Sequence, residues 1–168
     1  MSGLEPQPGR VLFNIISRQT GDFSDLTILC GETRIEVHQM IVCSQSKVLN
    51  TMCTIGFKET FSGEISMQED CPIFVEKMVD FFYTNDYQLD PSDAENLDDS
   101  FSASSLQIHA RMFALADKYD IGELCTLASS KYSWELMDSN SLVEFFDSIH
   151  DVYSLTPPSK RDLRDQVI

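Results

Sequence analysis

Residues 23–61 decide the fold and read FSDLTILCGETRIEVHQMIVCSQSKVLNTMCTIGFKETF. Apolar side chains alternate along 26–30 and again along 35–37, with Gly31-Glu32 between the two runs. Alternation around a tight turn is typical of a β-hairpin with one buried face. A short helix is expected after His38, and Ser46 is in position to cap a second helix. The apolar residues of that second helix are Val48, Leu49, Met52 and Cys53.

The remaining elements follow from apolar spacing. Residues 63–67 alternate like a third strand, and Pro72 stands in the first turn of a helix with an apolar stripe at Val75, Met78, Val79 and Phe82. The segment 105–119 carries two apolar stripes, which predicts a helix buried on two sides. Two further helices are expected, with caps at Asp120 and Ser141. The last of them has an amphipathic stripe at Leu142, Phe145, Phe146, Ile149, Val152 and Tyr153.

This order of elements resembles the BTB/POZ domain, and most closely the fungal BTB proteins. The similarity covers roughly residues 23–135 and rests on five short pieces in the expected order. They are Ser24-Asp25-Leu26, the run from Val37-His38 to Ser44, Gly56-Phe57-Lys58-Glu59, the run FYTNDY at 82–87, and the run HARMFALADKY at 109–119. The resemblance implies an α/β (α+β) fold in which a small mixed sheet lies against a helical cluster, with additional C-terminal helices.

Three segments are expected along the chain. Residues 1–22 form an N-terminal arm and a helix. Residues 23–135 form the BTB/POZ domain, interrupted at 88–104 by an acidic, serine-rich stretch that predicts a mobile insertion. Residues 136–168 form a helical extension, in which Ser159 would cap a last helix. That helix stops after its first turns, so the extension is expected to be truncated.

Composition excludes several classes of function. The chain has 168 residues and a net charge of −15, which disfavours direct binding to a nucleic-acid backbone. No apolar run approaches the ~20 residues of a membrane span, and the first ten residues do not resemble a signal peptide. The five cysteines are an odd number at mostly apolar positions. They predict reduced thiols in a cytoplasmic or nuclear protein.

The sequence contains no motif that indicates catalysis, metal binding or phosphate binding. The three histidines, His38, His109 and His150, have no metal-ligand spacing to cysteine or carboxylate. No nucleophile elbow or phosphate-cradling glycine loop is present. The chain is therefore expected to be no enzyme and to need no cofactor. It is expected to work through protein partners.

The resemblance implies three groups of site residues. Phe57 and Glu59 match the apolar-x-Glu triplet with which cullin-binding BTB domains contact their cullin. Leu12, Ile15 and Ile16 lie on a helix that in this family often packs across a two-fold axis, so they predict a homodimer interface. Asp25 and His38 would line a small polar pocket near that interface; alternatively, Asp25 caps the hairpin entry and His38 caps the following helix.

The expected function is thus a substrate adaptor of a cullin–RING ubiquitin ligase. The alternative is a self-associating scaffold, or a transcription-linked BTB protein, with no role in ubiquitination. An ion-channel assembly domain is disfavoured, because no membrane span follows. The sequence names neither a substrate nor a downstream partner.

Overall fold

The computed structural model describes residues 18–54, 63–90, 103–138 and 141–167. The chain divides into two compact units, Met1–Tyr87 and Gln88–Ile168. Of the described residues, those in the first unit form the sheet and the helices within 39–84, and those in the second form the helices within 105–155 and a short 3₁₀ turn. The predicted α+β fold is confirmed.

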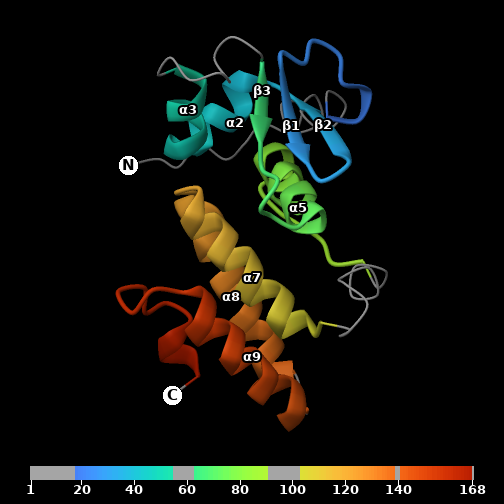
Figure 1. Cartoon of the computed structure of the whole chain (residues 1–168). Helices are drawn as coiled ribbons and strands as arrows, with labels where there is room; N and C mark the ends of the chain where they lie inside the picture. The colour runs from blue at the N-terminus through green and yellow to red at the C-terminus, as the bar shows by residue number, and fades with distance from the viewer. Residues whose placement is uncertain (1–17, 55–62, 91–102, 139–140, 168) are drawn as a thin grey trace, which may run out of the picture. The chain divides into compact units, whose positions relative to one another are not determined.

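The sheet of the first unit has three strands in the order β2-β1-β3 (Figure 1). Strand β1 (Leu26–Cys30) pairs antiparallel with β2 (Thr33–Val37), and Gly31 takes a φ of 58° in the turn between them. This positive φ is tolerated by glycine because it has no Cβ. Strand β3 (Glu64–Ser66) pairs with the other edge of β1 and runs parallel to it. The sheet is therefore mixed, as predicted.

One face of this sheet is buried. The inward side chains are Leu26, Ile28 and Cys30 from β1, Ile35 and Val37 from β2, and Ile65 from β3. They are the residues that the alternation predicted to share a face. The outward face is polar apart from the half-buried Leu29, and Arg34 there donates to the Glu64 carboxylate at 2.8 Å across the sheet. The period-two pattern thus placed the hairpin correctly.

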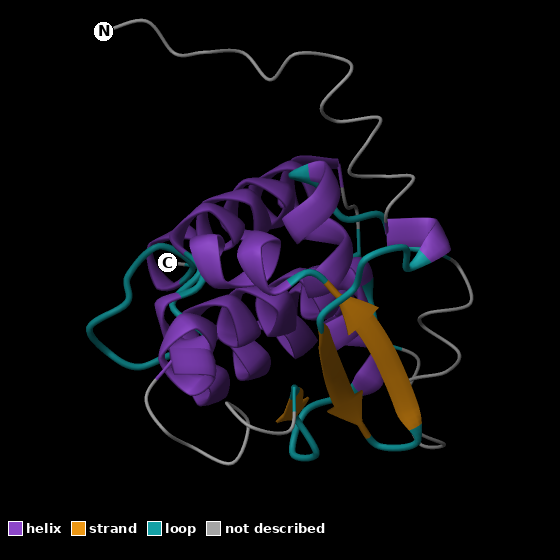
Figure 2. Cartoon of the chain, turned by 90° about the horizontal axis from the view of Figure 1, so that it is seen from above, coloured by secondary structure: helices purple, strands orange, loops and turns teal. Residues whose placement is uncertain are grey.

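Helices α2 (Gln39–Gln45), α3 (Lys47–Thr54) and α5 (Pro72–Thr84) belong to the described part of the first unit. Figure 2 draws all helices in purple and the strands in orange. Helices α2 and α3 follow the hairpin, and α5 follows β3. The Ser46 hydroxyl accepts a hydrogen bond from the Leu49 amide at 3.1 Å, which confirms the predicted cap. Helix α5 is buried on more sides than its stripe indicated, since Phe74, Phe81 and Tyr83 are buried as well.

The second unit is helical. Helix α7 (Ser105–Lys118) packs against both α8 (Gly122–Asp138) and α9 (Leu142–Leu155). This explains its two apolar stripes, because Leu106, Ala110 and Phe113 on one side and Ile108, Met112 and Leu115 on the other are all buried. The prediction of a helix buried on two sides is confirmed.

Helix α7 begins with a capping box at Ser104. The Ser104 hydroxyl accepts from the Gln107 amide at 3.3 Å, and the Gln107 side chain accepts from the Ser104 amide at 3.1 Å. Ala103 is buried. Ala103 and Ser104 therefore belong to the start of α7 and not, as the sequence pattern predicts, to the acidic insertion. Residues 91–102 of the insertion lie outside the described residues.

The predicted cap at Asp120 is wrong by one residue. Asp120 takes a left-handed φ of 51° and ends α7, with its amide bonded to the Asp117 carbonyl and the Ile121 amide bonded to the Ala116 carbonyl. This pair of bonds is a Schellman motif, in which the left-handed residue follows the C-cap. The first carbonyl of α8 that accepts an intrahelical bond is that of Ile121. A capping aspartate and a helix-ending aspartate look alike in sequence.

The stripe predicted on α9 does not form its core face. Ser141 caps the helix as expected, by accepting from the Glu144 amide at 3.4 Å. Of the stripe residues, however, only Val152 is fully buried, while Leu142 and Phe146 are exposed. The final helix predicted from Ser159 is also wrong. Its segment forms only a 3₁₀ turn, η1 (Arg164–Gln166), with Leu163 buried beside it.

We expect Ser104→Ala to lower the free energy of unfolding by about 1 kcal/mol, because it leaves a helix-start amide without its side-chain acceptor. Urea denaturation of the whole chain measures this. Ser105→Ala is the matched control, since it changes a neighbouring serine outside the capping box, and it should change stability by less than ~0.5 kcal/mol. Equal losses in the two variants would contradict the assigned cap.

The stability of the chain should also depend on pH through His109. Burial, with a contribution from Lys131, lowers the pKa of His109 from 6.5 to about 4. Between these two values the unfolded chain binds a proton that the folded chain does not, so the free energy of unfolding falls as pH falls. Across the whole window the loss is roughly 3 kcal/mol.

The measurement is chemical denaturation of the wild-type protein and His109→Gln at pH 7 and pH 5. Carboxylates titrate equally in both proteins, so the difference between them isolates the histidine. The wild-type protein should lose more stability on acidification than His109→Gln. Parallel losses would show that His109 is protonated alike in the folded and unfolded chain.

Candidate functional site

The start of α2 is capped by the carboxylate of Asp25, the residue directly before β1. The Oδ1 atom of Asp25 accepts a hydrogen bond from the Gln39 amide at 2.7 Å. This amide is the first of the helix and has no partner within it. A negative charge at this end of a helix is also favourable for the helix dipole. Asp25 thus caps α2 from a distance in sequence, and it is an exposed residue.

His38 joins α2 to α5 through the hydroxyl of Tyr83. The His38 amide donates to this hydroxyl at 2.9 Å, and the Nδ1 atom of the ring lies 2.8 Å from it. The Nε2 atom lies 2.8 Å from the Asp22 carbonyl oxygen, which can only accept. The proton therefore belongs on Nε2, and Nδ1 accepts from the Tyr83 hydroxyl. Burial is the main cause that raises the pKa of Tyr83, which keeps this hydroxyl a donor.

These contacts correct the alternative in which Asp25 caps the hairpin entry and His38 caps the following helix. His38 occupies the N-cap position of α2, but its side chain makes no capping bond. Asp25 supplies that bond instead. Whether the pair also lines a pocket beside a dimer interface stays a prediction. Asp25 does border an open depression on α2 and α3, which is also lined by Gln39, Met40, Cys43, Ser44 and Asn50.

The thiols near this depression are not poised to react. Burial, followed by the neighbouring Cys53 thiol and Asp25, raises the pKa of Cys43 to about 12. A thiol this weakly acidic is almost wholly protonated at neutral pH and is a poor nucleophile. None of the five cysteines forms a disulfide. Cys30 and Cys53 are core thiols, whereas Cys43, Cys71 and Cys125 are partly exposed, and the reduced state of all five stays a prediction.

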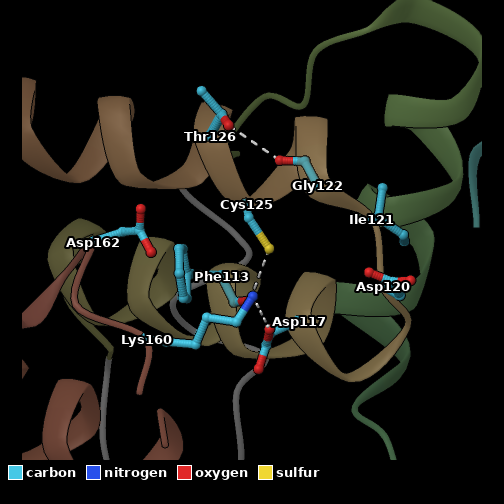
Figure 3. A pocket seen from close by; sticks show the side chains of 9 residues that line it. All are labelled: Phe113, Asp117, Asp120, Ile121, Gly122, Cys125, Thr126, Lys160 and Asp162. Carbon is cyan, nitrogen blue, oxygen red and sulfur yellow. Dashed lines mark hydrogen bonds and ion pairs between the residues drawn. The ribbon is translucent and has the colours of Figure 1, made fainter. Parts of the chain in front are cut away.

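A second pocket, of about 180 Å³, lies in the helical unit and was not predicted (Figure 3). Lys160 crosses it to meet the Asp117 carboxylate at 2.8 Å, and the Cys125 thiol donates to the Phe113 carbonyl at 3.9 Å. Burial, with Asp117 as the next cause, raises the pKa of Cys125 to about 11. Lys160, the basic residue that lines this pocket, is thus already paired with Asp117. This ion pair attaches the C-terminal segment to α7.

The other predicted site residues lie outside the described part of the chain. This holds for Phe57 and Glu59 and for Leu12, Ile15 and Ile16. Residues 18–20, the first that the structure describes, are helical. The cullin contact and the dimer interface therefore stay predictions.

Within the described residues, no cluster of three or more His, Cys, Asp or Glu side chains could hold a metal ion. No helix among them is both long and apolar enough to cross a membrane. What the described site offers is therefore a set of hydrogen-bonded junctions between secondary-structure elements.

Comparison with known proteins identifies the fold family. The family description "BTB/POZ domain" matches residues 16–136. The BTB domain of human gigaxonin superposes with a TM-score of 0.54 at 16% identity, covering 77% of this chain and 95% of that one. The BTB domain of zebrafish PATZ1 gives a TM-score of 0.55 at 14% identity, covering 76% and 96%. At these identities the two structures show the fold alone.

Curated relatives are Kelch-like proteins of animals. Kelch-like protein 36 of rat is 27% identical over 46% of this chain, and Kelch-like protein 7 of chicken is 26% identical over 49%. The matches span only 13% and 14% of the length of those two proteins. The predicted likeness to fungal sequences stays a prediction. Since the family match covers most of the chain and agrees with the mixed sheet and its helices, the chain belongs to the BTB/POZ domain family.

Proposed function

We propose that this chain is a protein–protein interaction module, not an enzyme, and that it acts as a substrate adaptor of a cullin–RING ubiquitin ligase. Membership of the BTB/POZ family supports the interaction module, and the similarity to Kelch-like proteins supports the adaptor. The five cysteines form no disulfide among themselves, which suits a reducing compartment, so we assign the protein to the cytoplasm or the nucleus.

The observation that carries the adaptor role is the position of Phe57 and Glu59 along the chain. Helix α3 ends at Thr54 and β3 begins at Glu64, so the triplet falls in the connection between them. This is the place of the apolar-x-Glu triplet in cullin-binding BTB domains. The phenylalanine would fill an apolar pocket of the cullin, and the carboxylate would meet a polar or basic group.

We expect Phe57→Ala to weaken binding of a cullin N-terminal domain at least ~30-fold. An apolar anchor in a pocket contributes more than about 2 kcal/mol, and about 1.4 kcal/mol corresponds to a factor of ten. Glu59→Lys should also weaken binding, because it reverses a charge at the contact. Calorimetry with the cullin from the same organism is the measurement.

Lys58→Ala is the matched control, since it changes the middle residue of the triplet and should keep most of the affinity. All variants must melt as the wild-type protein does, so that a loss of binding is not a loss of folding. A wild-type protein without detectable binding at tens of micromolar would refute the adaptor role and leave a plain interaction scaffold.

The second candidate is a self-associating scaffold or a transcription-linked BTB protein. The apolar spacing of Leu12, Ile15 and Ile16 favours it, because a stripe of this kind on a terminal helix suits a two-fold interface. Residues 18–20, which follow this stripe in the sequence, are helical. Dimerisation is compatible with the adaptor role as well, so its test stands by itself.

A dimer built on this stripe should dissociate in Ile15→Asp, because a charge buried at an apolar interface is costly. Asn14→Asp adds the same charge beside the stripe and should leave the assembly unchanged. Light scattering at high micromolar concentration measures both. A wild-type protein that is monomeric there excludes the dimerising scaffold.

A further inference from the structure

Strand β2 lies at one edge of the sheet. The order β2-β1-β3 gives it a single neighbour, and among the described residues its other edge pairs with no strand. We call this other edge the open edge of β2. An open edge carries backbone N–H and C=O groups that can pair with a further strand. Which residues point these groups to the open edge follows from the pairing of β1.

Strand β1 divides its backbone groups between its two neighbours. The Thr27 amide donates to the Gly63 carbonyl at 2.8 Å, on the side of β3. Backbone groups of successive residues in a strand alternate between its two edges, so those of Ile28 point toward β2. The partner of Ile28 on β2 is Ile35. Ile35 therefore points its own backbone groups toward β1.

Arg34 and Glu36 flank Ile35 in β2, so their N–H and C=O groups point to the open edge. Within the part of the chain that the structure describes, these four groups have no hydrogen-bond partner. The edge thus offers two donors and two acceptors in the spacing of a β-ladder. An extended chain laid alongside β2 would pair with all four.

A groove of about 350 Å³ follows this edge. It is lined by residues 33–36 of β2, by residues 18–21 and by Glu76 of α5. Side chains of successive strand residues point to opposite faces of a sheet, so a hollow on one face would touch only alternate residues. Contact with four successive residues places the groove along an edge. Because β1 occupies the other edge of β2, the groove lies at the open one.

The charged residues that line this groove are two arginines and two glutamates. Both arginines already meet carboxylates outside the lining, Arg18 at 3.4 Å and Arg34 at 2.8 Å. Glu36 accepts a hydrogen bond of 3.4 Å from the Ser24 hydroxyl, and neither Glu36 nor Glu76 has a cationic partner among the described residues. The unpaired charge of the groove is therefore negative, which favours a basic partner.

We propose that the open edge of β2 binds an extended segment of another protein that carries lysine or arginine. The backbone of that segment pairs with the N–H and C=O groups of Arg34 and Glu36 and so adds a strand to the sheet. Its basic side chains meet the carboxylates of Glu36 and Glu76. Binding at this edge requires neither a cullin nor the Phe57 triplet.

The probe is a short peptide in which pairs of lysines alternate with pairs of threonines, titrated into the whole chain by calorimetry. Threonine favours strands, and the paired order places lysine on both faces of an extended chain. A second peptide has the same sequence with N-methylated backbone amides, which keep the charge but cannot donate. A third has glutamate in place of lysine. We expect the first peptide to bind and the other two to bind at least ~10-fold more weakly.

The charge of the groove is tested by the double variant Glu36→Gln, Glu76→Gln, which should weaken the lysine peptide several-fold. The matched control is the double variant Asp138→Asn, Asp147→Asn. It removes the same charge from two exposed acids of the second unit and should leave the affinity unchanged. Both double variants must melt as the wild-type protein does.

Amide hydrogen exchange measured by NMR locates the contact. In the free protein the amides of Arg34 and Glu36 should exchange much faster than the Ile35 amide, because only the last is bonded within the sheet. A saturating amount of the lysine peptide should slow the exchange of Arg34 and Glu36 at least ~10-fold and leave that of Ile35 unchanged.

Three results would overturn the proposal. The first is no binding of the lysine peptide at high micromolar concentration. The second is equal affinity of the methylated and unmethylated peptides, or of the two double variants, which would reduce binding to unspecific attraction by the acidic chain. The third is slow exchange of Arg34 and Glu36 in the free protein, because the chain itself or a second copy would then cover the edge. No cullin enters these experiments, so their failure leaves the role of Phe57 untouched.

Discussion

The central strand β1 is the element on which the first unit depends. It alone has neighbours on both edges, with β2 antiparallel on one side and β3 parallel on the other. Its inward residues Leu26, Ile28 and Cys30 are buried, so a slip of one residue would turn this set toward solvent. The parallel pairing requires the chain to leave the sheet after β2 and return, and α2 and α3 lie in that connection.

The junction around His38 links the sheet to α5. The His38 ring there forms hydrogen bonds with two groups distant in sequence, the Asp22 carbonyl and the Tyr83 hydroxyl. Buried polar groups without partners are costly, so a network of this kind specifies one arrangement of the elements it joins. Asp25 and His38 therefore have a structural role in the described chain, irrespective of any pocket at a dimer interface.

The second unit distributes its polar and apolar surfaces differently. Helix α7 is buried on two sides and provides the apolar packing for α8 and α9. Helix α9 is then held by Ser148 and Asp151, and its apolar residues are left facing outward.

Sequence by itself determined the hairpin, the helix stripe from Val75 to Phe82 and the two-sided burial of α7, because the spacing of apolar residues states which faces must be buried. It also indicated the BTB/POZ fold, through a resemblance carried by five short pieces of sequence and not through periodicity. The tertiary structure alone decided that Asp25 rather than His38 caps α2, and that Asp120 ends α7 rather than starting α8. It also decided which face of α9 turns inward. Hydrogen bonds between residues distant in the chain, such as those of Ser148 and Asp151, oppose the apolar pattern there, and no local spacing reveals them.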